Sequence, residues 1–142
     1  MIAIGCDHGG YQLKQAVIRH LADRGIDFHD FGTYSEESCD YPEYGEAVGR
    51  AVASGECELG IVICGTGIGI SIAANKVRGV RAAVCGDCFS AEMCRRHNNA
   101  NVLALGGRVI GPGLALKIVD IFLSTGFDAR RVARISEIED RS

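Results

Sequence analysis

The residues Leu59-Gly-Ile-Val-Ile-Cys-Gly-Thr-Gly-Ile-Gly69 decide the fold of this chain. The first six are continuously apolar and rich in β-branched side chains, as expected for a parallel strand that is buried on both faces. A glycine loop follows at once, and it leads into a short helix predicted to end near Lys76. A strand that passes through a glycine turn into a helix is the βα unit of open α/β sheets.

Four more βα units flank this one. Strands are predicted at 2–6, 26–31, 81–85 and 102–105, with a polar loop at 33–41. Apolar side chains at helical spacing predict helices that end before Gly25 and Gly55, and further helices over 90–97 and 113–123. Five successive units predict one domain, residues 1–142, with a five-stranded parallel sheet and right-handed crossovers. A terminal helix over about 129–141 has no strand after it, so we expect it to pack across another subunit.

The composition limits the classes of protein to which the chain can belong. Its net charge of -3 argues against binding to nucleic acid or to an anionic membrane. No stretch approaches the roughly 20 apolar residues that span a bilayer, and the N-terminus has no leader pattern. The seven cysteines are an odd number without a framework spacing, which favours reduced thiols in a cytosol. We therefore expect a cytoplasmic protein without disulfides.

Residues that follow the strands are the candidate site, because ligands of an open parallel sheet bind at the carboxyl ends of its strands. Asp7 and His8 follow the first predicted strand, and Cys64 with its glycine loop follows the third. His97 and Asn98 follow the fourth helix. We expect carboxylate, imidazole, thiol and amide groups around one crevice.

The glycine loop allows a ligand to approach the backbone closely, and it opens into the N-terminus of a predicted helix. Such a loop can hold a phosphate or stabilise an oxyanion, or it can serve only to pack the helix tightly on the strand. Cys64 favours a chemical role, because a helix N-terminus is a position where a thiolate forms. A lone cysteine elsewhere is more often a buried packing residue.

Two other kinds of site are disfavoured. Gly65-Thr-Gly67 begins the G-x-G-x-x-G fingerprint of dinucleotide-binding folds, but Ile70 takes the position of the third glycine, and the chain is too short for a separate substrate domain. A zinc site is disfavoured because the paired C-x-x-C halves of common zinc motifs are missing. Its ligands would be Cys85, Cys88, Cys94 and His97. We expect free thiols and no metal.

Arginines supply positive charge near the predicted crevice. Arg108 follows the fifth predicted strand, and Arg130, Arg131 and Arg134 cluster in the terminal segment. Clustered arginines are most often solvated surface residues. Guanidinium groups together with His8 are also well suited to bind a phosphate dianion, which we keep as a hypothesis.

Five runs of residues occur in order and cover almost the whole chain. They are Gly5-Cys-Asp-His-Gly-Gly10, Asp40-Tyr-Pro42, Ile63-Cys-Gly-Thr-Gly-Ile-Gly-Ile-Ser-Ile-Ala-Ala-Asn-Lys76, Arg96-His-Asn98 and Asn101-Val-Leu-Ala-Leu-Gly106. Together they closely resemble the ribose-5-phosphate isomerase B family and its galactose-6-phosphate isomerase relatives. The resemblance implies a Rossmann-like three-layer αβα sandwich. It also implies a phosphorylated sugar as substrate and a homodimer, or a higher oligomer built from it, with active sites between the subunits.

By that resemblance the chain interconverts ribose 5-phosphate and ribulose 5-phosphate through an enediolate, without a metal or organic cofactor. Cys64 is the base, His97 opens the furanose ring, and Thr66 assists. The enediolate and the sugar oxygens would be bound by Asp7, Gly65, Gly67, Ile68, Gly69, Ser71 and Asn98. The phosphate would be bound by His8, Arg108 and Arg131.

The sequence departs from the family near its carboxyl end. The family usually has a Gly-Gly-Arg-His segment, two further residues and an Arg, whereas Phe127-Asp-Ala-Arg-Arg131 is a few residues shorter. One phosphate-binding arginine is therefore missing or replaced by Arg130. Two other functions stay open: an isomerase of a six-carbon sugar 6-phosphate of the allose or galactose type, and a non-catalytic sugar-phosphate binder.

Overall fold

The computed structural model describes residues 1–127 and 129–142, and for 129–132 it describes the backbone without the side chains. Its five strands form a single parallel sheet in the order β2-β1-β3-β5-β4. The strands are β1 (Ile2–Cys6), β2 (Phe28–Asp30), β3 (Leu59–Cys64), β4 (Ala82–Val84) and β5 (Val102–Gly106). The predicted five-stranded parallel sheet is confirmed.

In the described part of the chain, six α-helices and one short 3-10 helix connect and follow the strands. They are η1 (His8–Gly10), α1 (Tyr11–Asp23), α2 (Tyr41–Ala53), α3 (Ile68–Asn75), α4 (Cys88–Arg96), α5 (Pro112–Ser124) and α6 (Ala129–Arg141). None of the helices that the structure describes is both long enough and apolar enough to cross a membrane.

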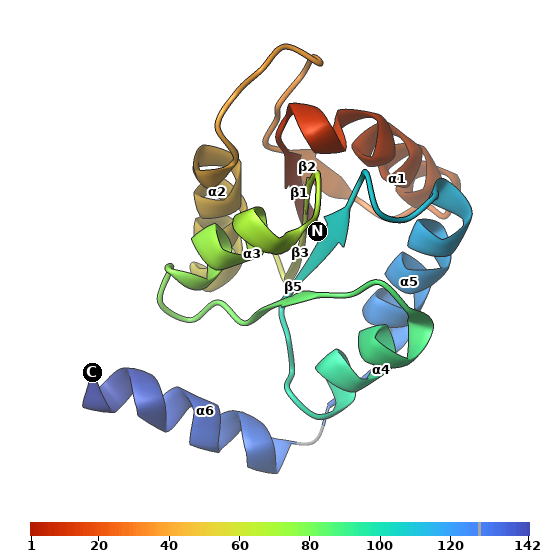
Figure 1. The fold of residues 1–142 in the computed structure, drawn as a ribbon. Coiled ribbons are helices and arrows are strands. Elements are labelled where there is room, and N and C mark those ends of the chain that lie inside the picture. The colour runs from red at the N-terminus through yellow and green to blue at the C-terminus, as the bar shows by residue number, and fades with distance from the viewer. Residues whose placement is uncertain (128) are drawn as a thin grey trace.

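Side chains of the central strands alternate between the two faces of the sheet, and this separates the helices into two layers. Ile61 and Ile63 of β3 belong to a core that also contains side chains of α1, α4 and α5. Val62 and Cys64 belong to a second core, shared with α2 and α3. Figure 1 shows these two groups of helices on opposite sides of the strands. The predicted three-layer αβα sandwich is confirmed, and Cys64 faces the layer of α2 and α3.

The two edge strands are shorter than predicted. β2 spans 28–30 and β4 spans 82–84, whereas the sequence predicted 26–31 and 81–85. The neighbouring strands β1 and β5 continue to Cys6 and Gly106, so the regular pairing ends because the edge segments themselves leave it. Single hydrogen bonds continue past the strands, for example from the Cys85 N–H to the Ala104 carbonyl at 3.1 Å. The difference therefore concerns strand ends and leaves the order of the sheet unchanged.

The last helix leaves the sandwich. Figure 1 shows α6 below the sheet, away from the helices that cover its faces. It is tied to its own chain beyond α3, where the Gly79 N–H donates to Glu139 Oε2 at 2.9 Å and Arg78 Nη2 donates to the Glu139 carbonyl at 3.1 Å. Ile138 stays 57% exposed. The packing of this helix across another subunit stays a prediction.

Candidate active site

The strand order changes direction between β1 and β3, because β2 lies on one side of β1 and β3 on the other. Ligand crevices of open α/β sheets form at the carboxyl ends of the strands at such a point. Here the loops after β1, β3 and β5 meet. The Asp7 N–H donates to the Ile63 carbonyl at 3.2 Å, and the Gly107 N–H donates to the Cys64 carbonyl at 2.8 Å. Asp7, His8 and Cys64 thus lie at the carboxyl end of the sheet, as predicted.

The three loops approach so closely that a side chain would be tight at Gly9 and would clash at Gly107. A Cβ atom on Gly9 would lie 3.1 Å from the Gly65 nitrogen, and one on Gly107 would lie 2.7 Å from the Gly9 carbonyl oxygen. Gly67 has a second reason to be glycine, because its φ of 81° lies in the left-handed region. The glycines therefore serve the packing of the loops as well as access to their backbone.

Cys64 is the last residue of β3 and is only 5% exposed. The backbone N–H of Gly67 donates a hydrogen bond to its Sγ at 3.2 Å. An N–H that faces sulfur stabilises negative charge there, as the N-terminus of a helix does for an anion. The structure thus supplies a partner for a thiolate at the place where the three loops meet.

A second thiol, Cys6, ends the neighbouring strand β1 but lies in the core shared with α1. Burial raises the pKa of Cys6 to about 12, and the nearby Lys14 offsets only part of this effect. Cys6 therefore stays protonated near neutral pH. Of the two thiols that end central strands, Cys64 is the candidate base.

Thr66 and Ser71 shape the start of α3. Thr66 Oγ1 accepts a hydrogen bond from the Ile68 N–H at 3.2 Å, and Ser71 Oγ donates to the Ile68 carbonyl at 2.7 Å. The N–H groups of Gly67 and Ile68 are thus already used within the loop. Three other N–H groups of the loop make no hydrogen bond within the described part of the chain. They belong to Gly65, Thr66 and Gly69.

Asp7 caps η1. Its Oδ1 accepts hydrogen bonds from the Gly9 N–H at 2.9 Å and the Gly10 N–H at 3.2 Å. The residue is 7% exposed. Its other oxygen, Oδ2, makes no hydrogen bond to a residue that the structure describes. One carboxylate oxygen is therefore structural, and the other is available to a hydroxyl group.

Arg108 lies beside the glycine loop, as predicted from its position after the fifth strand. Its backbone N–H donates to the Gly65 carbonyl at 2.9 Å. A Cβ atom on Gly65 would lie 3.5 Å from Arg108 Cδ and 3.6 Å from Nη1, so the exposed side chain covers this glycine. The structure thereby brings a positive charge to the loop that follows Cys64.

Two residues that the sequence did not single out contact the predicted site. The Cys39 N–H donates to His8 Nδ1 at 3.2 Å. The Tyr41 ring lies against α3, where a Cβ atom on Gly69 would be 2.7 Å from its Cζ. The only sequence signal was the Asp40-Tyr-Pro42 run, which indicates the start of a helix but not which segment it contacts.

His97 lies at the other end of the sheet from Cys64. It follows α4, which returns the chain from the end of β4 to the beginning of β5. In the register of β3 with β5, Val102 is beside Gly60 and Gly106 is beside Cys64. Val102 and Gly106 are four residues apart along β5, which is a distance of about 13 Å in a strand. One chain therefore does not bring His97 to its own Cys64.

One of the remaining predicted site residues lies at the same end of the sheet as His97, and the side chains of the other two lie outside the described residues. Asn98 lines a cavity of about 360 Å³ together with Arg81, Ala83 and Ile135 of α6. Arg130 and Arg131 belong to the first turn of α6, but their side chains lie outside the described residues. Their assignment to a phosphate stays a prediction.

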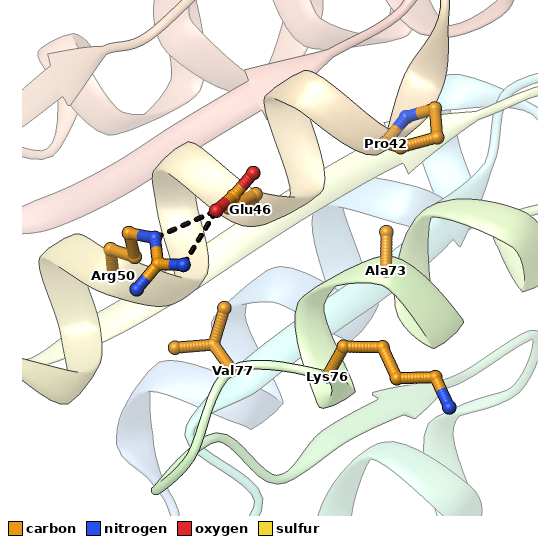
Figure 2. Close-up of a pocket in the computed structure, with 6 residues that line it drawn as sticks. All are labelled: Pro42, Glu46, Arg50, Ala73, Lys76 and Val77. Carbon is orange, nitrogen blue, oxygen red and sulfur yellow. Dashed lines mark hydrogen bonds and ion pairs between the residues drawn. The ribbon is translucent and has the colours of Figure 1, made fainter.

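A surface cavity of about 270 Å³ lies between α2 and α3 (Figure 2). Its lining residues are Pro42, Glu46, Arg50, Ala73, Lys76 and Val77. Figure 2 shows Arg50 paired with Glu46 on α2, with 2.6 Å between Nη2 and Oε2, while the Lys76 side chain extends away from the pair. None of the predicted site residues lines this cavity, so it is separate from the candidate site at the carboxyl ends of the strands.

The thiols considered for zinc do not assemble into a ligand set. Cys85 Sγ and Cys94 Sγ are 3.8 Å apart and both are buried. The hydrogen bond to Cys94, together with burial, raises the pKa of Cys85. Among the residues that the structure describes, no three His, Cys, Asp or Glu side chains are placed to hold a metal ion. All seven cysteines are free thiols.

Known proteins with similar sequences cover nearly the whole chain. The model of the Ribose/Galactose Isomerase family matches residues 2–138. Ribose-5-phosphate isomerase B of Escherichia coli is 51% identical over 144 residues, which is 99% of this chain and 97% of that protein. A galactose-6-phosphate isomerase subunit of Clostridium acetobutylicum is 44% identical over 127 residues, which is 89% of this chain and 73% of that protein.

Solved structures agree with the sequence matches. Ribose-5-phosphate isomerase B of Clostridium thermocellum is 57% identical with a TM-score of 0.96, and the match covers 99% of this chain and 97% of that one. The Mycoplasma genitalium enzyme with bound ribulose-5-phosphate is 38% identical with a TM-score of 0.93 and the same coverage. The predicted resemblance is confirmed, so this protein is an isomerase. The chain belongs to the Ribose/Galactose Isomerase family.

Proposed function

We propose that this chain interconverts ribose 5-phosphate and ribulose 5-phosphate. The observation that carries the proposal is the buried Cys64 thiol, which receives the Gly67 N–H at 3.2 Å where three strand-end loops meet. The relatives support the choice of substrate. The ribose-5-phosphate isomerase B proteins of Escherichia coli and Clostridium thermocellum are 51% and 57% identical to this chain, against 44% for the galactose-6-phosphate isomerase subunit, although other proteins of the first name are 44% and 38% identical.

The reaction moves one proton between neighbouring carbon atoms. The Cys64 thiolate takes the C2 proton of the open-chain aldose, the C–H electrons form a C1–C2 double bond, and the aldehyde oxygen becomes the enediolate oxygen. The C2 hydroxyl then loses its proton to O1, and the thiol returns its proton to C1, which leaves the ketone at C2. The free N–H groups of Gly65, Thr66 and Gly69 are suited to hold the negative oxygen.

Ring opening requires a second copy of the chain in this proposal. His97 and Asn98 lie at the opposite end of the sheet from Cys64 in the same chain. A symmetric pair of chains can bring His97 of one copy to Cys64 of the other. Ile68 and Ile72 support an interface on the α3 side, because each is 55% exposed close to the candidate site. We therefore propose a homodimer with an active site between the copies.

Phosphate binding is assigned to His8 and Arg108, with Arg130 and Arg131 of the terminal helix. His8 precedes Gly9, which packs against Gly65, and the Arg108 N–H donates to the Gly65 carbonyl, so both residues follow strands whose loops meet at Gly65. A guanidinium group and an imidazole N–H both donate to phosphate oxygens. We place the reaction in the cytoplasm, because free thiols are stable in a reducing compartment.

Turnover of a panel of sugar phosphates tests the activity. Purified protein should convert ribose 5-phosphate with a kcat/KM at least about tenfold above those for allose 6-phosphate and galactose 6-phosphate. A preference for either hexose phosphate would show instead that the protein is an isomerase of a six-carbon sugar 6-phosphate. The shortened 127–131 segment is the reason to test this alternative. Binding without turnover of any substrate would identify a sugar-phosphate binder.

A second experiment tests His97 alone. His97→Asn should lose most turnover of the cyclic ribose 5-phosphate but keep much more activity on an open-chain tetrose phosphate, which needs no ring opening. The ratio of the two rates within one variant does not depend on the folded fraction. Equal losses on both substrates in a folded variant would remove the ring-opening role.

A further inference from the structure

Residues 33–40 are part of the segment between β2 and α2 and form neither helix nor strand; we call them the strap. The strap passes beside η1, where the Cys39 backbone N–H donates a hydrogen bond to His8 Nδ1 at 3.2 Å. The two residues are 31 positions apart, so the contact depends on the tertiary fold. His8 is also a residue to which the proposed function assigns phosphate binding.

The beginning of the strap is held by a buried lysine. Lys14 of α1 is fully buried, its Nζ pairs with Asp30 Oδ1 at 2.7 Å, and it donates to the Thr33 carbonyl. The Tyr34 ring covers the amine, with 5.2 Å from Nζ to the ring centroid. Separating a buried ion pair leaves an uncompensated charge, so this anchor resists displacement. The strap is thus fixed at its beginning as well as at Cys39.

The Cys39 contact determines which nitrogen of His8 carries the proton. A neutral imidazole has one N–H donor and one acceptor nitrogen. Nδ1 receives an N–H from Cys39, so Nδ1 is the acceptor and the proton is on Nε2. Nε2 itself makes no hydrogen bond within the part of the chain that the structure describes. We infer that the strap holds His8 as an Nε2–H donor for phosphate, with Cys39 as a positioning residue.

The phosphate part of this inference rests on the proposed function and deepens it. Phosphate oxygens are acceptors, so a ring nitrogen that faces them has to carry a proton. In the other tautomer the lone pair of Nε2 would face the phosphate and repel it. A strap that sets the tautomer of His8 beforehand removes that rearrangement from the cost of substrate binding.

Two-bond ¹H–¹⁵N NMR spectra of the ¹⁵N-labelled protein test the tautomer directly. The chain has four histidines, and the His8 signals are those that disappear in His8→Gln. At a pH where the ring is neutral, Nε2 should have the chemical shift of a protonated nitrogen and Nδ1 that of an unprotonated one. The reverse pattern, or averaged shifts, would overturn the inference without any reference to activity.

Two variants of Cys39 separate the backbone donor from the thiol. Cys39→Pro removes the N–H, whereas Cys39→Ala keeps it and deletes only the thiol, whose Sγ lies 4.0 Å from His8 Nδ1. The Nε2–H pattern should be lost in Cys39→Pro and kept in Cys39→Ala. Loss in both, or retention in both, would overturn the role of the N–H. If Cys39→Pro does not fold, as judged by circular dichroism, the spectra of the unmodified protein and of Cys39→Ala still decide the tautomer.

A pair of His8 variants tests the phosphate contact. Glutamine places its amide N–H near the position of Nε2, and asparagine places it near Nδ1. KM for ribose 5-phosphate should be about tenfold higher in His8→Asn than in His8→Gln, with a smaller difference in kcat. Equal KM values would overturn the phosphate role. An Nε2–H pattern in a protein that turns over no sugar phosphate would instead overturn the proposed function and leave the positioning role intact.

Discussion

Cys64 and Cys6 end neighbouring strands, yet their side chains enter opposite faces of the sheet. Cys64 faces α2 and α3 and receives the Gly67 N–H, whereas Cys6 lies in the core with α1. Burial raises the pKa of Cys6 to about 12. Cys6 is beside Ile63 in the register of the two strands, so Cys64 is one residue further along. The two thiols therefore face opposite sides of the sheet, and each packs against a different layer of helices.

The raised pKa of Cys6 predicts slow alkylation. At pH 8 about one Cys6 in ten thousand is a thiolate, so iodoacetamide should label the half-buried Cys39 and Cys88 long before Cys6. Mass spectrometry of tryptic peptides after timed labelling measures the order. Labelling in denaturant is the control, in which the three residues should react at similar rates. Equal rates in the folded protein would contradict the environment described for Cys6.

Replacing the proposed base should remove chemistry and keep binding. Cys64→Ala should lower kcat by about 10³-fold or more, with binding of ribose 5-phosphate changed only a fewfold. Incorporation of solvent deuterium into the sugar should disappear as well. Cys6→Ala is a matched variant, in which turnover per folded molecule should persist. Deuterium exchange that persists in folded Cys64→Ala would show that another residue is the base.

At the scale of elements, the junction of β3 and α3 depends on Gly67. Its φ is 81°, and a Cβ atom there would lie 2.8 Å from the Leu105 carbonyl carbon. Gly67→Ala should lower the free energy of unfolding by about 2 kcal/mol or more, because strain and a backbone clash add. The displaced Gly67 N–H would also leave Cys64 Sγ, so turnover should fall.

Gly113 supplies the matched control for this prediction. It lies in α5, where a Cβ atom would meet nothing within 4 Å, and its φ is not in the left-handed region. Gly113→Ala should raise the free energy of unfolding by about 0.5 kcal/mol, because alanine favours the helix. Urea denaturation of both variants measures the difference. Similar values for both would contradict the role given to the conformation of Gly67.

At the scale of the whole molecule, the parallel sheet places the two proposed catalytic side chains at opposite ends. Every strand runs in the same direction, so residues that directly follow a strand and residues that directly precede one lie at opposite ends of the sheet. Cys64 ends β3, whereas His97 lies shortly before β5. A complete site in the proposed reaction therefore requires two chains.

Mixing two inactive variants tests this arrangement. Cys64→Ala and His97→Asn each carry one defect, and a mixed dimer contains one site with both defects and one with neither. After subunit exchange in an equal mixture, about a quarter of the unmodified activity should return, because half of the dimers are mixed and each has one intact site. Each variant mixed with itself is the control. No recovery, with exchange verified by mass spectrometry of the intact dimer, would show that one chain forms the whole site.

The order of elements followed from local patterns. The apolar run at 59–64 indicated a strand buried on both faces, and the glycine loop after it indicated the turn into α3. Both features depend on residues close together in the chain, so the sequence is sufficient to predict them. The predicted β2 and β4 were too long, because the point at which an edge segment leaves its neighbour depends on the tertiary packing of the loop that follows it.

Part of the candidate site could likewise be predicted from the sequence, and part could not. Asp7, His8 and Cys64 were predicted at one crevice because each directly follows a parallel strand, and this rule needs only the sequence. The contact of Cys39 with His8 and the separation of His97 from Cys64 were decided by the tertiary structure alone. Both depend on strand order and on the path of loops between distant segments. Those arise from the packing of the whole chain, which no local pattern of residues encodes.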